Sequence, residues 1–233
     1  MSSRKPVVAI DGPTAAGKST VARGVAARLG LRYVDTGAMY RSVAVAALSG
    51  GVDLADAGAV TRLADAITIE FLPAAPATEE GIGERVLVDG RDLTEIIRTP
   101  EASDGASRVS VVPGVRAALV ARQRVMGAEG GVVMEGRDIG TVVFPNADVK
   151  VFLNASLDAR ARRRHAELQA RGRAVSLEEV RRIEAERDRR DETRAHSPLR
   201  PAEGAVVIDT TTMGAEDVIE AIVRLVRERT GVV

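Results

Sequence analysis

Residues 12–20 have the composition of a loop that binds phosphate groups. They read Gly-Pro-Thr-Ala-Ala-Gly-Lys-Ser-Thr and fit the pattern Gly-x-x-x-x-Gly-Lys-[Ser/Thr]. Glycines let the backbone turn tightly and bring its N–H groups against phosphate oxygens. Lys18 adds a mobile positive charge for β- and γ-phosphates, and the Ser19 hydroxyl can bind Mg²⁺. The predicted phosphate loop consists of Gly12, Pro13, Thr14, Ala15, Ala16, Gly17, Lys18, Ser19 and Thr20.

The segments on either side of the phosphate loop support this interpretation. Val7–Ile10 is a short apolar run, typical of a buried parallel strand. After the loop, Val21, Val25 and Leu29 recur every four residues, as on one face of a helix. The positive end of such a helix attracts the same anion as the loop. A chance glycine-rich turn would not require this order of strand, loop and helix.

Composition limits the class of protein. A chain of 233 residues suits one large domain, or one domain with an inserted piece. Lys and Arg number 33, as do Asp and Glu, so no general attraction to nucleic acid or membranes is expected. The absence of cysteine excludes disulfides and thiolate metal sites. No apolar run approaches a membrane span or a signal-peptide core, and we expect a cytoplasmic protein with neither membrane nor nucleic-acid partner.

Short apolar strands alternate with helices along most of the chain. The predicted strands are 7–10, 31–34, 132–135, 147–153 and 205–209. This alternation predicts an α/β protein with a parallel sheet and helices on both faces, as in P-loop NTPases. Polar residues follow several strands, at Asp35–Thr36, Gly136–Asp138 and Asn154. Because ligands bind at the carboxyl edge of such sheets, we expect the site there.

Residues 68–95 interrupt this alternation. Residues 68–72 alternate like a half-buried strand, 73–83 read as a loop, and 85–93 read as a hairpin around Asp89–Gly90. The segment predicts a small antiparallel insert. A helix capped by Asp53 or Asp56 should precede it, and two helices, 99–110 and 113–126, should follow it.

Two charged helices are predicted over 156–170 and 176–193, separated at Gly172. Most of their arginines suit a solvated face with i, i+4 ion pairs. Alternatively, the pair forms a mobile lid whose arginines meet the phosphates during phosphoryl transfer. Arg187, Asp191 and Arg194 follow the spacing i, i+4, i+7, which predicts one shared helix face.

Other motifs leave several readings open. Asp35–Arg41 suits a second anion site, or a simple helix cap with a surface arginine. His165 and His196 have no partners in the sequence that suggest nucleophilic catalysis, and we expect them to be incidental. The sequence shows no metal-ligand cluster and no Asn-Lys-x-Asp motif of the kind by which GTP switches read guanine.

Four segments together make the chain resemble the bacterial cytidylate kinases, a family of nucleoside monophosphate kinases. The resemblance covers nearly the whole length. It rests on 10–13 leading into the phosphate loop, on 35–41, on 136–145 and on 187–191. Family members also carry a small β insert where we expect one at 68–95. The resemblance implies one domain over 1–233, a monophosphate-binding region over 36–110 and a lid over 156–194.

The resemblance also implies roles for individual residues. Arg41, Arg137 and Arg194 would hold the acceptor phosphate, and Ser107, Arg116 and Asp138 would read cytosine. Arg187 and Asp191, near Tyr40 and Thr36, would hold the ribose, while Arg160, Arg163 and Arg164 would be lid arginines. The catalytic set would then be Lys18, Arg137, Arg163, Arg164 and Arg194, with Arg160 on the ATP side. The family often has Gly at position 15, and Ala fits there if its φ is negative.

The activity implied is in-line transfer of the γ-phosphoryl group of Mg-ATP to CMP or dCMP, giving CDP or dCDP for pyrimidine metabolism. ATP and Mg²⁺ would be the cofactors, CMP and dCMP the small-molecule partners, and the protein a monomer. An adenylate or uridylate kinase is the nearest alternative. A non-catalytic nucleotide-binding regulator is an alternative from a different class.

Overall fold

The structure, a computed structural model, describes residues 5–72 and 84–231. It divides into two compact units, one made of residues up to 35 and from 123 onward, the other of residues 36–122. The expected loop at 73–83 lies outside the described residues. None of the helices in the described part of the chain combines the length and apolar character needed to cross a bilayer.

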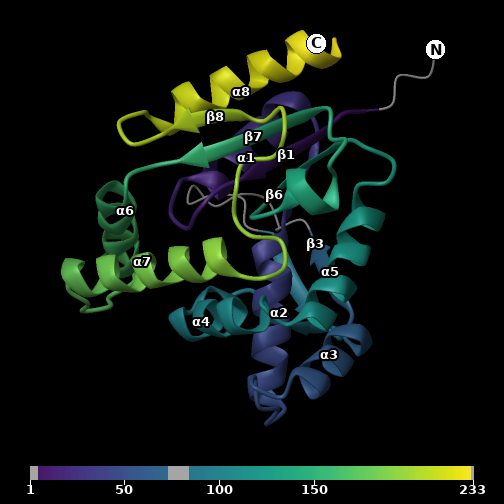
Figure 1. Cartoon of the computed structure of the whole chain (residues 1–233), viewed down its shortest axis with the longest axis vertical. Helices are drawn as coiled ribbons and strands as arrows, with labels where there is room; N and C mark the ends of the chain where they lie inside the picture. Colours follow the sequence, from purple (N-terminus) through teal and green to yellow (C-terminus); the bar gives the residue numbers. More distant parts are fainter. Residues whose placement is uncertain (1–4, 73–83, 232–233) are drawn as a thin grey trace. The chain divides into compact units, whose positions relative to one another are not determined.

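A parallel sheet forms the centre of the first unit, in the order β2-β6-β1-β7-β8 (Figure 1). The strands are β1 (Val7–Asp11), β2 (Arg32–Asp35), β6 (Val132–Gly136), β7 (Val149–Asn154) and β8 (Val206–Asp209). In register, Asp11 lies opposite Gly136, and Asp35 lies opposite Glu135. The polar residues that end the strands therefore share the carboxyl edge. The predicted α/β fold with a parallel sheet is confirmed.

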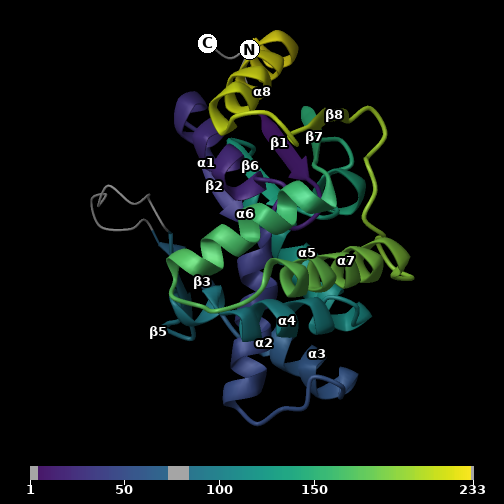
Figure 2. The ribbon, with the colours of Figure 1, turned by 90° about the vertical axis from the view of Figure 1, so that its left-hand side faces the viewer.

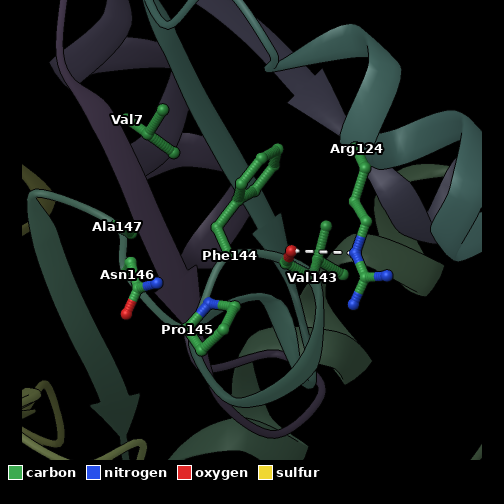
Figure 3. Close-up of a pocket in the computed structure, with 7 residues that line it drawn as sticks. All are labelled: Val7, Arg124, Val143, Phe144, Pro145, Asn146 and Ala147. Carbon is green, nitrogen blue, oxygen red and sulfur yellow. Dashed lines mark hydrogen bonds between the residues drawn. The ribbon is translucent and has the colours of Figure 1, made fainter.

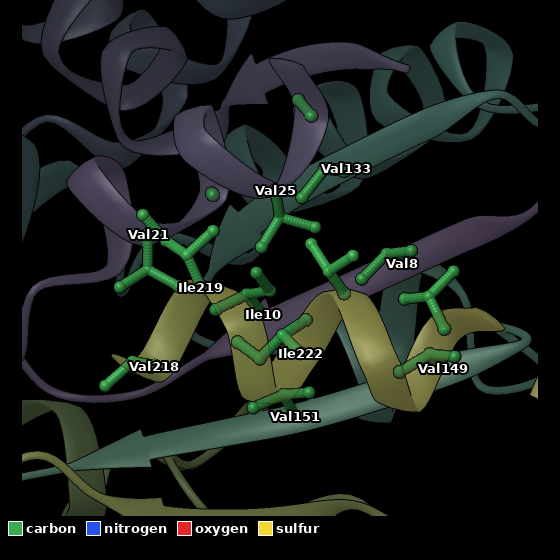
Figure 4. Close-up of a cluster of buried hydrophobic side chains, with 14 of the residues drawn as sticks. Val8, Ile10, Val21, Val25, Val133, Val149, Val151, Val218, Ile219 and Ile222 are labelled. Atoms are coloured by element: carbon green, nitrogen blue, oxygen red, sulfur yellow. The ribbon is translucent and has the colours of Figure 1, made fainter. Parts of the chain in front are cut away.

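Helices of the first unit pack on the sheet and on one another. They are α1 (Lys18–Leu29), α6 (Leu157–Ala170), α7 (Leu177–Thr193) and α8 (Ala215–Thr230). Val21 and Val25 of α1 and Ile222 of α8 belong to one buried cluster with Ile10 and Val151 of the sheet (Figure 4). Apolar side chains at helical spacing thus bury one face of each helix against β-branched strands. Figure 2 shows α6 and α7 lying alongside each other, and Ala161, Leu168 and Val180 are buried between them.

One detail of this unit was not predicted. Residues Ile139–Val143 form a single π-helical turn, η2, where no element was predicted; five residues are too few to show a helical period. Arg194 was expected on the same helix face as Arg187 and Asp191. It is the C-cap residue of α7, and its helical φ of −62° keeps it on the side of Asp191, with Nη1 4.0 Å from Asp191 Oδ1.

The second unit combines helices with a small antiparallel sheet. Its helices are α2 (Thr36–Ser49), α3 (Ala57–Ala66), η1 (Ile96–Arg98), α4 (Pro100–Val109) and most of α5 (Pro113–Met126). The sheet consists of β3 (Ile69–Leu72), β4 (Arg85–Val88) and β5 (Arg91–Asp92), as predicted for the insert. Asp89 and Gly90 have φ values of 49° and 76°, which suits the tight hairpin turn. Asp56, rather than Asp53, caps α3 by accepting a hydrogen bond from Ala59 N.

Candidate active site

The phosphate loop lies between β1 and α1, as the sequence predicts. At Gly12, φ is 149°, and a Cβ atom there would lie 2.0 Å from the carbonyl oxygen of Leu153. No residue larger than glycine fits at this position without moving β7. Gly17 has a φ of 91° and stands as the N-cap of α1, so α1 begins at Lys18 itself. The positive end of α1 is therefore available to an anion held by the loop.

Ala15 does not meet the condition stated for an alanine at this position. Its φ is 57°, in the left-handed region, rather than negative. A left-handed backbone brings Cβ close to the following carbonyl oxygen and costs roughly 1–2 kcal/mol for a non-glycine residue. The phosphate loop holds Ala15 in this conformation, which the residue type alone did not reveal.

Lys18 is buried and folded back on its own loop. Its Nζ atom donates a 2.6 Å hydrogen bond to the carbonyl oxygen of Pro13, and the residue is 6% exposed. Burial, followed by the nearby Arg137 guanidinium, lowers the pKa of Lys18 from 10.5 to about 7. The ammonium therefore lies where an anion would stabilise its charged form strongly.

Arg137 connects the phosphate loop to α7. Its Nη2 atom donates to the Thr14 hydroxyl at 2.6 Å, and its Nε atom donates to Asp191 Oδ2 at 2.9 Å. Burial favours the neutral form of Arg137, but Asp191 outweighs it and raises the pKa of the guanidinium. The structure thus brings together two predicted acceptor-site residues and one residue of the phosphate loop.

Asp11 holds the segment that follows Arg137 in place through two hydrogen bonds. Its two carboxylate oxygens accept hydrogen bonds of 2.8 Å from Ile139 N and Gly140 N, at the start of η2. Burial raises the pKa of Asp11 to about 6 although both hydrogen bonds oppose the increase. Asp138, the predicted cytosine-reading residue, lies just before η2 and is 5% exposed.

The predicted lid arginines already have protein partners. Arg160 is bound by Asp188 of α7, with Nη2 2.6 Å from Oδ2. Nη1 of Arg163 donates to the Thr210 hydroxyl at 3.1 Å, and that hydroxyl in turn donates to Ala16 O of the phosphate loop. Arg164 pairs at 3.0 Å with Glu167 on its own helix. Arg160 also donates from Nη1 to Thr14 O at 3.3 Å, so Arg160 and Arg163 both lie close to the phosphate loop.

The remaining predicted residues of this unit lie on α7 or at its end. Arg187 is half-buried on α7 and acts electrostatically on both Lys18 and Asp191. Arg194 is 8% exposed, and its Nε atom donates to the carbonyl oxygen of Ser197. Nη1 of Arg194 lies 4.0 Å from Asp191 Oδ1. Asp191 therefore lies next to both Arg137 and Arg194.

Glu135 was not singled out from the sequence. It ends β6, opposite Asp35 of β2, and it is 3% exposed. Hydroxyl groups of Ser19 and Tyr33 hydrogen-bond to its carboxylate. Burial, then the charge of Asp35, raises the pKa of Glu135. The signal that could have revealed it is a carboxylate at the end of an otherwise apolar strand, in register with Asp35.

The second unit holds the other predicted substrate-binding residues. Thr36, Tyr40 and Arg41 occupy the first turns of α2, where Thr36 is 3% exposed. The guanidinium of Arg116 lies 5.9 Å from the Tyr40 ring centroid, and its Nη1 donates to Ser110 O at 3.3 Å. Ser107 on α4 is 5% exposed, and its hydroxyl has no hydrogen-bond partner among the residues that the structure describes. Such a buried hydroxyl can serve a ligand.

A separate hollow lies at the other edge of the first unit, beside Val7 at the start of β1 (Figure 3). Residues 143–147 line much of it, and Nε of Arg124 donates to Val143 O at 3.2 Å. None of the residues predicted for phosphate or nucleotide binding lines it. His165 lies elsewhere, with Nε2 3.0 Å from Val175 O, in a local contact between α6 and the segment that precedes α7. Among the residues that the structure describes, no group of three or more His, Cys, Asp or Glu side chains could hold a metal.

Comparison of the sequence with known proteins identifies the family of this chain. The model of the family described as cytidylate kinase matches residues 8–228. A cytidylate kinase of Solibacter usitatus (strain Ellin6076) is 50% identical over 228 residues, covering 97% of this chain and 94% of the relative. One of Geobacillus kaustophilus (strain HTA426) is also 50% identical, covering 98% and 99%. A bifunctional pantoate ligase/cytidylate kinase of Synechococcus sp. (strain JA-3-3Ab) is 52% identical; the alignment covers 97% of this chain, which spans only 41% of that longer protein. These matches show that the chain belongs to the cytidylate kinase family.

Proposed function

We propose that this protein is a phosphotransferase that transfers the γ-phosphoryl group of ATP to CMP and dCMP, forming CDP and dCDP. The observation that carries the proposal is the guanidinium of Arg137, which joins Thr14 of the phosphate loop to Asp191. A donor site and an acceptor site must meet for in-line transfer, and this arginine would lie at that junction. Membership in the cytidylate kinase family supports the identity of the acceptor.

ATP would occupy the phosphate loop. Backbone N–H groups of residues 12–20 and the start of α1 suit the triphosphate, and Lys18 suits its β- and γ-phosphates. Phosphate oxygens would replace Pro13 O as the partner of Lys18 Nζ.

The residues near Ser19 fit a magnesium ion. The Ser19 hydroxyl, Glu135 and Asp35 offer hard oxygen donors at the carboxyl ends of β2 and β6, and Ser19 is hydrogen-bonded to Glu135. When bound, Mg²⁺ would neutralise charge on the β- and γ-phosphates. Ser19 would be a direct ligand of the ion. Glu135 and Asp35 would hold water molecules bound to the ion.

Three arginines would hold the acceptor phosphate: Arg41, Arg137 and Arg194. Asp191 supports this assignment because it lies against both Arg137 and Arg194 in the first unit. Asp191 and Arg187, with Tyr40 and Thr36, would bind the ribose.

Ser107, Arg116 and Asp138 would read the base. A carboxylate such as Asp138 can accept a hydrogen bond from the exocyclic amine of cytosine. The buried Ser107 hydroxyl, without a partner in the described part of the chain, supports a ligand at that position.

The chemistry then needs alignment and positive charge rather than a covalent intermediate. The acceptor phosphate is itself a nucleophile, so no side chain has to act as a base. Lys18, Arg137, Arg163, Arg164 and Arg194 would stabilise charge on the transferred group, with Arg160 on the ATP side. Closing of α6 and α7 over the site would exclude water that otherwise hydrolyses ATP. We expect a monomer that works in the cytoplasm.

A coupled assay with ATP and Mg²⁺ tests the proposal with CMP, dCMP, UMP, AMP and GMP as separate acceptors. CMP and dCMP should give the highest kcat/KM. Equal or higher turnover with AMP or UMP would favour the adenylate or uridylate kinase alternative, and nucleotide binding without turnover would favour the regulator. Lys18→Met should abolish turnover while circular dichroism stays unchanged; retained activity would contradict the role given to Lys18.

A further inference from the structure

Asp188 lies within the run 187–191 that carries the family resemblance, yet none of the roles described above requires it. Its carboxylate faces Arg160 across the packed helices α6 and α7. Oδ1 accepts from Nη1 at 3.1 Å, and Oδ2 accepts from Nη2 at 2.6 Å. The side chains of Arg160 and Asp188 are only 6% and 16% exposed. Asp188 therefore makes a two-pronged ion pair of the geometrically specific kind.

The guanidinium of Arg160 also reaches two other segments. Its Nε atom donates to Ala155 O, just after β7, at 3.0 Å. Its Nη1 atom donates to Thr14 O, in the phosphate loop, at 3.3 Å. One planar group thus joins the phosphate loop, the end of a central strand and α7. Its fixed fork geometry allows all these bonds at once, which a lysine could not reproduce.

The negative charges that compensate this guanidinium come from α7. Backbone carbonyls at residues 14 and 155 satisfy donors but do not neutralise a buried cation. Asp188 supplies the contacting negative charge, and Glu184, one turn earlier on α7 and 3% exposed, acts on the same guanidinium through space. Displacing α7 would leave Arg160 charged, buried and uncompensated, so this pair opposes displacement of the helix.

Three of the side chains proposed to bind the acceptor depend on α7. Arg187 and Asp191 lie on it, and Arg194 is its C-cap residue. Asp188 stands between Arg187 and Asp191 in the sequence, and its bond to Arg160 ties this stretch of helix to Thr14.

We propose that Asp188 is a positioning residue that, through the guanidinium of Arg160, holds α7 and its acceptor-binding side chains in place on the phosphate loop. Arg160, which the resemblance assigns to the ATP side, then acts mainly as a structural link between the donor and acceptor sites rather than as a free charge for ATP. The kinetic consequences rest on the proposed function, whereas the structural link does not.

The matched variants are Asp188→Asn and Glu192→Gln. Asparagine keeps the size of Asp188 but turns one acceptor into a donor and removes the charge. Glu192 lies on the same helix and is exposed. Glu192→Gln therefore removes the same charge from α7 without affecting the contact between Asp188 and Arg160. For each variant, we would measure kcat and KM for CMP, the Kd of a non-hydrolysable ATP analogue, and amide hydrogen exchange of α7 without ligand.

Asp188→Asn should lower kcat/KM for CMP by about tenfold to a hundredfold, as small misplacements of reacting groups do. The Kd of the ATP analogue should change by less than about twofold, because the loop amides and Lys18 remain in place. Amide exchange of α7 should become faster, and Glu192→Gln should match wild type in every measurement. Arg160→Lys, which keeps the charge but cannot bridge all three segments, should give the same pattern and serves if Asp188→Asn does not fold.

Two results would overturn the proposal. Loss of analogue affinity in parallel with kcat/KM would make Arg160 a triphosphate ligand that Asp188 merely orients. Wild-type kinetics and exchange in Asp188→Asn would show that the pair positions nothing. A wild-type protein inactive toward CMP would instead defeat the proposed function, and the exchange experiment would still decide whether Asp188 holds α7.

Discussion

Arg137 and Asp191 form a buried ion pair in which Nε donates to Oδ2 at 2.9 Å. The Arg137 side chain is 19% exposed and that of Asp191 is 8% exposed, so both charges are largely removed from water. Burial alone would raise the pKa of Asp191, but Arg137 and Arg187 outweigh it and lower the pKa below 3.8. The arginine is thus oriented before any phosphate binds.

Asp191→Asn should destabilise the fold. It leaves a buried guanidinium without its counter-charge, and breaking such a pair typically costs about 3–5 kcal/mol. Denaturant unfolding measures the loss, with Glu192→Gln as the exposed control. Because the folded-state pKa of Asp191 is depressed, its contribution is present above pH 3.8 and is lost as the pH falls through the folded value. The difference between wild type and variant should therefore be constant at neutral pH and shrink below about pH 4. A difference that grows toward acid would contradict this.

Nucleotide binding should take up protons near neutral pH. Burial and Arg137 lower the pKa of Lys18 to about 7 in the ligand-free protein, so part of the lysine is neutral above that pH. A bound phosphate favours the ammonium and raises the pKa back toward its ordinary value. Titration calorimetry of an ATP analogue at pH 8, in buffers of different ionisation enthalpy, should show proton uptake. Lys18→Met should abolish this uptake; unchanged uptake in the variant would assign the proton to another group.

Ala15→Gly should stabilise the protein. The left-handed φ of 57° strains alanine but not glycine, and we expect a gain of up to about 1 kcal/mol in the free energy of unfolding. Ala16, the next residue, is 0% exposed and is not among the residues with positive φ. Ala16→Gly is therefore the control and should lose roughly 1 kcal/mol. Thermal unfolding of both variants measures the contrast, and a loss in Ala15→Gly would show that the backbone is unstrained.

Ser107→Ala should separate stability from substrate binding. A buried hydroxyl without a partner in the described part of the chain costs desolvation, so its removal should leave the free energy of unfolding unchanged or raise it by about 1 kcal/mol. If Ser107 reads the base, KM for CMP should rise about tenfold, equivalent to one lost hydrogen bond. Ser42 on α2 is likewise buried with an unpaired hydroxyl among the described residues. Ser42→Ala should share the stability effect without the change in KM; a shared KM change would reveal a general packing effect.

Sequence patterns predicted the features that depend on residues close together in the chain. The phosphate loop, the Asp89–Gly90 hairpin and the charged helices were predicted because composition and period act locally. The positive φ of Ala15 was not predicted, because residue type alone does not determine the backbone angle within a loop.

Contacts between residues far apart in the sequence could not be predicted from local patterns either. The pair of Arg160 and Asp188 joins positions 28 apart, and the bonds of Asp11 to η2 span 128 residues. Glu135 was missed because its role depends on register with Asp35, which only the assembled sheet supplies.

The order of the central strands constrains how the chain can be made. β1 pairs with β6 and β7, and β2 pairs with β6, so neither amino-terminal strand meets a partner until residue 132 has been synthesised. During translation the phosphate loop therefore precedes the sheet that must support it. Such long-range pairing slows folding and leaves apolar strand edges exposed in the meantime. A truncated product ending before residue 132 should be a substrate for chaperones and proteases, and it should lack nucleotide affinity.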